Sequence, residues 1–297
     1  MRTGIWIPLV TPFRAGRVDI ETLQALASHY VDSGVAGFVA LGTTAETALL
    51  SDVERASVLQ TLVDTVAGRL PIVVGIGGLD TRQFVAEIDR LEHWDVAGYL
   101  VSAPAYLCPD QAGIRWHFEQ VARRTQRPVV LYNVPHRTGV SIEPATVRQL
   151  TSDTHIVAIK ECEPRHFDAL LNLPIDVLCG TDDAFVDCLA AGGTGGVLAS
   201  AHVCADLLVE IQRLAGSGLT VEARQLFDAL RPMIRLLFSA PNPSAIKAML
   251  ALDHMIANEV RMPITPVQPA LAAQLAVARE TLQALRAEKT ARIAVPG

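Results

Sequence analysis

The stretch Ile156–Lys160, with the sequence IVAIK, predicts a buried β-strand that ends in a basic residue. Three of its five residues are β-branched, and an unbroken apolar run is typical of a parallel strand covered on both faces. Other short runs of the same kind occur along the chain, and a segment with the helical spacing of apolar residues follows each of them. The predicted strands are Ile5–Val10, Gly37–Leu41, Ile72–Gly75, Gly98–Val101, Val129–Tyr132, Ile156–Lys160, Val177–Cys179 and Gly196–Ala199.

The alternation of these strands with helices predicts the fold class. Ser51 and Glu54 have the spacing of a capping box, and Asp80 and Asp110 mark further helix starts. Strands and helices that alternate eight times at intervals of about 20–35 residues are typical of a (β/α)8 TIM barrel, an α/β fold. A doubly wound open sheet would need a glycine fingerprint after its first strand, where this chain reads PLVTPF over Pro8–Phe13. We therefore expect a barrel.

The strands end before the last quarter of the chain. Val221–Leu237, Pro243–Asp253 and Pro269–Glu288 have helical patterns and are separated by segments that contain proline. This is more helix than the eighth unit of a barrel requires. We therefore expect a catalytic barrel over residues 1–224 and a C-terminal helical domain over residues 225–297.

Composition limits the partners and the compartment. The formal net charge is −6 and the pI is about 5.7, and no basic stripe alternates with aromatic residues, so neither nucleic acid nor an anionic membrane surface is an expected partner. The N-terminus lacks the pattern of a signal peptide, and no apolar run approaches the length of a membrane span. The odd number of cysteines, five, without a CxxC pair is typical of reduced thiols. We expect a soluble, cytoplasmic protein.

Lys160 is the first candidate for chemistry. Only three of the 25 lysines and arginines are lysines, and Lys160 is the one that ends a predicted buried strand. Burial disfavours the charged form of an amine, so we expect it to lower the pKa of Lys160 and to favour a neutral amine near pH 7. Such an amine is the nucleophile of a Schiff-base enzyme. The alternative is a lysine whose stem packs while its head reaches solvent.

Further polar residues follow the other predicted strands. Active sites of this fold lie at the carboxyl-terminal ends of the strands, which we call the mouth of the barrel. The residues predicted there are Thr43, Thr44, Tyr106, Tyr132, Arg137, Lys160 and Gly180. No cluster of His, Asp and Glu with metal-ligand spacing occurs among them, which argues against a metal-dependent aldolase.

The roles of these residues follow from imine chemistry, which moves a proton at every step. Tyr132 is the expected general acid and base, since its strand neighbours that of Lys160, and hydroxyls such as Thr43 and Tyr106 could tune it. Arg137 offers a planar fork to a carboxylate. The alternatives are a core tyrosine, an arginine that pairs with Glu143 or Glu161, and threonines that merely cap a helix.

The glycine-rich stretch Gly192–Gly196 resembles a phosphate loop but precedes the eighth strand, at the wrong end of the barrel for the usual phosphate site. We expect tight turns at its first two glycines, Gly192 and Gly193. The backbone of Gly196 and Val197 could approach a substrate closely, since glycine in a strand permits such an approach.

Seven motifs are spread along nearly the whole chain: Pro8–Phe13, Gly42-Thr43-Thr44-x-Glu46, Tyr132-Asn133-Val134-Pro135-x-Arg137-Thr138-Gly139, Ile159-Lys160-Glu161, Gly180-Thr181-Asp182-Asp183, Pro241-Asn242-Pro243 and Arg261-Met262-Pro263-Ile264-Thr265-Pro266. With these motifs the chain resembles one family, the pyruvate-dependent class I aldolases and lyases typified by dihydrodipicolinate synthase and N-acetylneuraminate lyase. Arg137, in the motif that begins at Tyr132, makes the chain more similar to the synthase branch, since the sialic-acid lyases lack this arginine.

The resemblance implies a reaction and an assembly. Lys160 would form a Schiff base with pyruvate, without a metal or other cofactor, and the product with L-aspartate 4-semialdehyde would be 4-hydroxy-tetrahydrodipicolinate, on the route to lysine and diaminopimelate. Family members are usually homotetramers built from two tight dimers.

The resemblance also implies roles for individual residues. Tyr132, Thr43 and Tyr106 would relay protons, with Tyr106 reaching in from a neighbouring subunit. Thr44 and the backbone near Val197 would hold the pyruvyl group, and Arg137 would hold the carboxylate of the aldehyde. Gly180 is a further expected substrate-binding residue.

The chain departs from the family pattern at three places. Ala45 replaces a glycine, which is tolerated if its φ is negative. Ala105 stands where the synthase commonly has a second tyrosine. The positions that match the lysine-inhibitor site carry none of the histidines, asparagine and glutamate of inhibited enzymes, so we expect weak or absent feedback by lysine. These positions are Asp52, Arg55, Leu79 and Gln83.

Two alternatives to the synthase stay open. One is a paralogous pyruvate-dependent aldolase or 2-keto-3-deoxy sugar acid dehydratase that uses the same lysine and tyrosine; Arg137 together with the hydroxyl relay distinguishes the synthase. The other is a catalytically inactive barrel with a binding or regulatory role.

Overall fold

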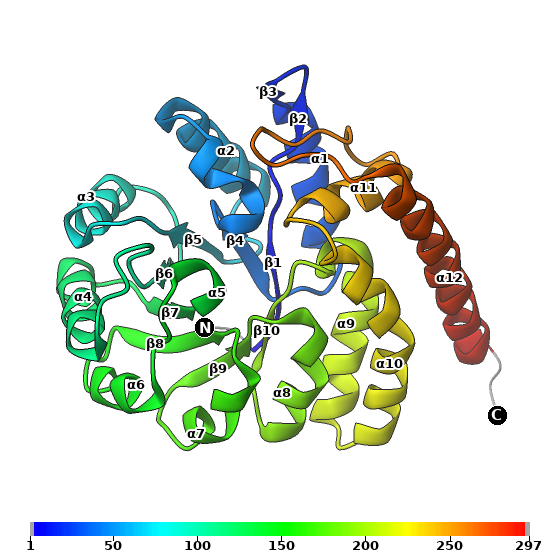
Figure 1. The fold of residues 1–297 in the computed structure, drawn as a ribbon. Helices are drawn as coiled ribbons and strands as arrows, with labels where there is room; N and C mark the ends of the chain where they lie inside the picture. The colour runs from blue at the N-terminus through cyan, green and yellow to red at the C-terminus, as the bar shows by residue number, and fades with distance from the viewer. Residues whose placement is uncertain (1–2, 295–297) are drawn as a thin grey trace.

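The chain forms the predicted barrel. The computed structural model describes residues 3–294, and the last three residues of the predicted helical domain lie outside this range. In the described part, eight parallel strands close in the order β1-β10-β9-β8-β7-β6-β5-β4, with helices around them (Figure 1). The fold class is confirmed. The strands are β1 Gly4–Pro8, β4 Gly37–Ala40, β5 Ile72–Ile76, β6 Gly98–Ser102, β7 Val129–Asn133, β8 Ile156–Glu161, β9 Asp176–Cys179 and β10 Gly195–Val197.

Helices cover the outside of the barrel, and several begin where the sequence predicts. Ser51 and Glu54 form the capping box, and the side chains of Asp80 and Asp110 accept backbone N–H groups of the next turn. A short hairpin, β2 Phe13–Arg14 and β3 Arg17–Val18, follows β1. The helices are α1 Ile20–Val31, α2 Asp52–Val66, α3 Thr81–Leu91, α4 Gln111–Arg124, α5 Pro135–Thr138, α6 Pro144–Leu150, α7 Phe167–Leu171, α8 Phe185–Ala191, α9 Ala201–Gly216, α10 Thr220–Leu237, α11 Ser244–Leu252 and α12 Pro269–Ala294.

The last three helices lie on one side of the barrel. α12 packs against α10 and α11, and α10 packs against α9 (Figure 1). α10 begins at Thr220, before the predicted boundary between residues 224 and 225, and that boundary stays a prediction. No helix in the described range combines the length and the apolar character that a membrane span requires.

The barrel interior is packed rather than hollow. One buried apolar cluster combines a side chain from each of the eight strands, and Tyr132 packs against it. Interior layers of this kind are typical of the fold. Within β7 and β8 the interior residues are Val130 and Ala158. The full cluster is Trp6, Val39, Val73, Leu100, Val130, Ala158, Leu178 and Val197.

Candidate active site

The alternation of side chains along β7 and β8 places Tyr132 and Lys160 inside the barrel. Val130 and Ala158 point inward, and residues two positions further along a strand point to the same side. Tyr132 and Lys160 are also direct partners in the parallel register. The Nζ atom of Lys160 lies 4.2 Å from the centroid of the Tyr132 ring, and Lys160 is only 7 % exposed. The lysine head therefore stays in the mouth and does not extend into bulk solvent.

The charge of Lys160 differs from the sequence expectation. Burial on its own lowers the pKa of Lys160, but the acidic groups of Tyr132, Cys162 and Asp182 outweigh burial, so the pKa of Lys160 lies above its ordinary value. The expectation that burial lowers the pKa of Lys160 was wrong because it ignored these neighbours. Because only an unprotonated amine is nucleophilic, imine formation at Lys160 would require removal of its proton.

Asp182 is a buried acidic neighbour of Lys160 that has no role in the predictions from sequence. It is 5 % exposed, and its Oδ1 atom accepts the backbone N–H of Ser200 at 2.7 Å, just before α9. Burial raises the pKa of Asp182, and its hydrogen bonds and Lys160 oppose that shift. Its position in the strand-end sequence was the available signal, but its electrostatic interaction with Lys160 arises only in the folded chain.

Gly180 permits the close approach of the lysine stem. A Cβ atom at this position would lie 3.0 Å from Cγ of Lys160 and 2.6 Å from Sγ of Cys162. Both distances are shorter than ordinary van der Waals contact, so a larger residue here would displace the lysine. The thiol of Cys162 is no competing nucleophile, because burial raises its pKa to about 11.

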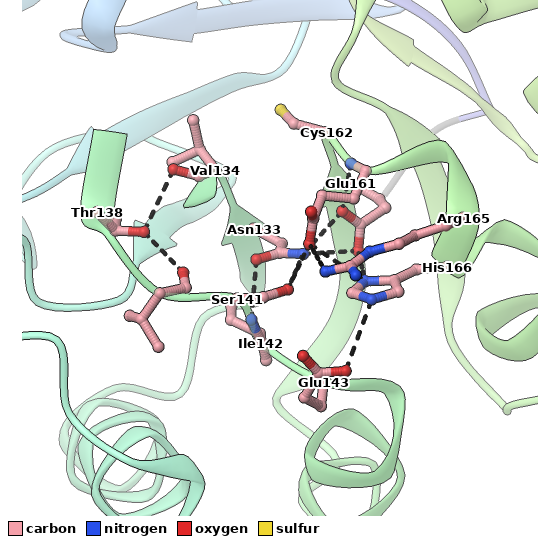
Figure 2. Close-up of polar contacts among 12 residues, drawn as sticks. Asn133, Val134, Thr138, Ser141, Ile142, Glu143, Glu161, Cys162, Arg165 and His166 are labelled. Carbon is pink, nitrogen blue, oxygen red and sulfur yellow. Dashed lines mark hydrogen bonds and ion pairs between the residues drawn. The ribbon is translucent and has the colours of Figure 1, made fainter. Parts of the chain in front are cut away.

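On the outer side of the same two strands lies a buried polar network (Figure 2). Asn133 and Glu161 are partners in the register, and the Asn133 side-chain amide donates to both carboxylate oxygens of Glu161, at 2.8 and 3.0 Å. The N–H of Glu163 donates to Oε1 of Glu161 at 2.7 Å. Nδ1 of His166 lies 3.3 Å from Oε2 of Glu161. Burial raises the pKa of Glu161 to about 8.

This network also fixes the segment that follows the candidate substrate-binding arginine. The side-chain oxygen of Asn133 accepts the N–H of Ile142 at 2.9 Å (Figure 2). The hydroxyl of Ser141 donates to Glu163 at 2.6 Å. Arg137 itself is exposed in α5. Glu143 and Glu161, its alternative partners, both lie beside His166 instead.

The turn after β4 carries the two candidate threonines. Thr43 is exposed, whereas Thr44 is buried and its hydroxyl oxygen accepts a hydrogen bond from the Asn242 amide at 3.0 Å. Both threonines lie in the 3-10 turn Thr43–Ala45, and the left-handed φ of +55° falls on Glu46. Ala45 thus occupies a helical position, which explains why this turn tolerates alanine in place of glycine.

Tyr106 lies apart from this arrangement in the single chain. Its side chain is 84 % exposed, beside the exposed Leu107, and its φ is +67°. A positive φ is uncommon for a bulky residue. Val197, a predicted substrate-binding residue, is buried in the barrel interior. Gly192 ends α8 in a left-handed turn, as expected for the glycine-rich stretch.

No group of three or more His, Cys, Asp or Glu within residues 3–294 is arranged to hold a metal ion. The chemistry available at the mouth is that of a buried amine and the phenol beside it. A closed (β/α)8 barrel with a lysine and a tyrosine side by side on neighbouring strand ends defines the class of Schiff-base lyases.

Comparison with known proteins specifies the family within this class. The model of the Dihydrodipicolinate synthetase family matches residues 1–282, and the chain belongs to that family. It is 38 % identical over 278 residues to 4-hydroxy-tetrahydrodipicolinate synthase 2 of Clostridium acetobutylicum, covering 92 % of this chain and 97 % of that one.

Solved structures agree with this assignment. The 4-hydroxy-tetrahydrodipicolinate synthase of Methylacidiphilum fumariolicum SolV superposes with a TM-score of 0.94 at 29 % identity, over 97 % of this chain and 98 % of that one. The dihydrodipicolinate synthase of Thermotoga maritima has a TM-score of 0.92 at 31 % identity, over 95 % and 99 % of the two chains. A monomeric dihydrodipicolinate synthase variant also has a TM-score of 0.92, at 30 % identity over 94 % and 96 %.

Proposed function

We propose that this chain condenses pyruvate, bound as a Schiff base to Lys160, with L-aspartate 4-semialdehyde to give 4-hydroxy-tetrahydrodipicolinate. The observation that carries the proposal is the buried amine of Lys160 beside the Tyr132 ring at the mouth of the barrel. The family and the names of the relatives support the substrates. The reaction belongs to the biosynthesis of lysine and diaminopimelate.

The first half of the reaction forms an imine. The Lys160 amine, once it has released its proton, attacks the keto carbon of pyruvate and forms a carbinolamine. The carbinolamine hydroxyl takes up a proton and leaves as water, and the C=N bond forms. Tyr132 is the group on the neighbouring strand that can supply and remove these protons. Thr43 and a Tyr106 from a second subunit complete the proposed relay.

The second half joins the two substrates. Loss of a methyl proton from the imine gives an enamine, and its carbon attacks the aldehyde of the second substrate, whose oxygen takes up a proton. The free amino group of the joined chain then attacks the imine carbon, its N–H protons pass to the lysine nitrogen, and Lys160 leaves as the amine while the ring C=N bond of the product forms. We assign the pyruvyl carboxylate to Thr44 and the backbone near Val197, with Gly180 leaving room, and the carboxylate of the aldehyde to Arg137. These contacts orient the reacting carbons.

The proposal includes the state of the enzyme. It is a cytoplasmic homotetramer, a dimer of dimers, and uses small-molecule substrates without nucleic acid or membrane partners. Lys160 supplies the covalent chemistry, so the proposed steps draw on no metal or other cofactor. The exposed Tyr106 with Leu107 supports a subunit contact at the mouth.

Borohydride trapping tests the proposal. Purified protein is treated with pyruvate and borohydride, and peptides are sequenced by mass spectrometry. We expect one reduced pyruvyl group on Lys160 and none in Lys160→Ala. An unmodified Lys160 in active, folded protein would remove the basis of the assignment.

A comparison of aldehydes then separates the synthase from its paralogues. Initial rates with pyruvate and either L-aspartate 4-semialdehyde or sugar-derived aldehydes give kcat/KM for each. We expect the semialdehyde to be preferred, and Arg137→Ala to lose most of this preference because it removes the carboxylate partner. A preference for sugar-derived aldehydes would favour the paralogous aldolase.

A further inference from the structure

A buried ion pair lies directly beneath the turn that carries Thr43 and Thr44. Nζ of Lys247, in α11, lies 2.5 Å from Oε1 of Glu46, and both side chains are completely buried. These residues come from distant parts of the sequence, and the proposed reaction assigns neither of them a role.

The surroundings of Lys247 are built around its charge. Its Nζ donates to the carbonyl oxygen of Glu259 at 3.0 Å and lies 4.1 Å from the centroid of the Phe13 ring. Burial lowers the pKa of Lys247, and Glu46 opposes that shift. A buried charge without its partner is strongly unfavourable, whereas an apolar pair of similar volume is often no less stable than an ion pair. Stability alone therefore does not account for charges here.

Glu46 is also the residue that gives the turn its shape. It adopts the left-handed conformation at the end of the turn, which is unfavourable for a residue with a side chain. Its second carboxylate oxygen accepts the N–H of Arg261 at 2.8 Å. The Arg261 guanidinium in turn donates to the carbonyl oxygen of Leu49 at 2.8 Å. The carboxylate is thus held from two sides by the chain that follows the barrel.

A second link joins the same region to the turn. The Asn242 amide donates to the hydroxyl oxygen of Thr44 at 3.0 Å. Because this bond uses a lone pair of the oxygen, the hydroxyl hydrogen of Thr44 remains available for a substrate carboxylate. Asn242 lies in the connection between α10 and α11, so both links originate outside the eight βα units.

We propose that the Glu46–Lys247 ion pair and Asn242 are positioning residues for pyruvate, through which the C-terminal helices set the Thr43–Thr44 turn at the mouth. The inference rests on the proposed function, since it assumes that Thr44 holds the pyruvyl group. Direct contact with the substrate is not part of this role. The C-terminal helices therefore contribute to the active site as well as to stability.

The test uses Glu46→Gln and Lys247→Met, which remove one charge each at nearly constant volume. Asp253→Asn is the matched control, since it breaks the ion pair with Arg279 that joins the end of α11 to α12. Pyruvate concentration dependence is measured by borohydride trapping at Lys160, and KM is measured for both substrates. Melting temperatures ensure that every variant is assayed folded.

We expect Glu46→Gln and Lys247→Met to require at least tenfold more pyruvate for half-maximal trapping, with a much smaller change in KM for the aldehyde. Asp253→Asn should lower the melting temperature and leave the pyruvate dependence unchanged. If either charge variant fails to fold, Asn242→Ala, at a half-buried position, supplies the readout, with an expected rise of severalfold.

The outcomes separate the two proposals. Absence of any adduct in the wild-type protein would refute the proposed function itself. A normal wild-type adduct, together with folded variants that show the wild-type pyruvate dependence, would overturn the positioning role alone. An equal rise in KM for both substrates would also contradict it, since that would indicate a general distortion of the mouth.

Discussion

Lys160 and Glu161 are adjacent in the chain, yet they face opposite sides of β8. Lys160 faces the barrel interior beside Tyr132, and Glu161 faces the helices beside Asn133. Strand alternation therefore places the Lys160 amine and the Glu161 carboxyl on opposite faces of the strand, although the two residues are adjacent. The two environments differ accordingly, because neighbouring acids raise the pKa of Lys160 while burial raises the pKa of Glu161 to about 8.

At Tyr132 we predict a loss of turnover on removal of a single hydroxyl. Tyr132→Phe keeps the ring that lies 4.2 Å from Nζ of Lys160 but removes the proton donor. We expect kcat to fall by about 10²–10⁴-fold, the usual contribution of general acid–base catalysis, while borohydride still traps pyruvate on Lys160 after long incubation. Steady-state kinetics measure this, and a kcat within a few-fold of wild type would exclude the assigned role.

At Glu161 we predict an effect of pH on stability. The folded protein keeps a proton on Glu161 up to about pH 8, whereas the unfolded chain releases it near the ordinary glutamate value. Stability contributed by this proton is full at low pH and is lost as pH rises through that window. Glutamine at this position cannot titrate. Between pH 5 and 8, the free energy of unfolding of Glu161→Gln should therefore fall less than that of the wild-type protein, and the difference should be on the order of 3 kcal/mol.

Denaturant titrations at several pH values measure this difference. Glu163→Gln is the control: burial raises the pKa of Glu163, but hydrogen bonds from Ser141 and Arg165 outweigh burial and lower it. The stability that the ionised Glu163 contributes is lost as the pH falls. Glu163→Gln should therefore not reduce the decline in the free energy of unfolding above pH 5. Parallel pH profiles of wild type and Glu161→Gln would contradict the prediction.

At the scale of elements, local signals predicted the strands and several helix starts, because caps and apolar periodicity depend on near neighbours. The bounds of the first and last strands were predicted less accurately. β1 ends at Pro8 and not at Val10, and β10 ends at Val197 and not at Ala199, because the register with neighbouring strands decides where a strand stops. The same limit applies to the Glu46–Lys247 pair and to Asn133 beside Glu161. Their partners come from separate elements, and no local pattern predicts such contacts.

The segments around α2 and α3 carry the prediction on feedback. Leu79, which is 50 % exposed, offers no side-chain hydrogen bond, and Arg55 places a positive charge near Asp52, at 3.9 Å. A guanidinium repels the ammonium groups of lysine. We expect millimolar lysine to leave the initial rate unchanged relative to sodium chloride at equal ionic strength. Saturable inhibition beyond that salt control would show that a lysine site exists.

At the scale of the whole molecule, the exposed Tyr106 is the residue that a single chain leaves unexplained. Its left-handed φ and 84 % exposure place a bulky aromatic side chain in solvent beside Leu107, although aromatic residues of this kind are enriched in subunit interfaces. The proposed relay would bring this hydroxyl into the mouth of a second chain. The proposed active site is then complete only in an assembly.

Complementation between two inactive variants tests this directly. Lys160→Ala lacks the nucleophile, and Tyr106→Phe lacks only the relay hydroxyl. In a mixed dimer, the chain with Tyr106→Phe keeps Lys160 and receives an intact Tyr106 from the chain with Lys160→Ala. One of the two active sites of the mixed dimer is therefore complete. Random pairing of equal amounts should therefore restore about a quarter of wild-type activity. Co-expressed variants should exceed the sum of the two separate proteins. If Tyr106 serves its own chain, every mixed site lacks one group and no activity returns.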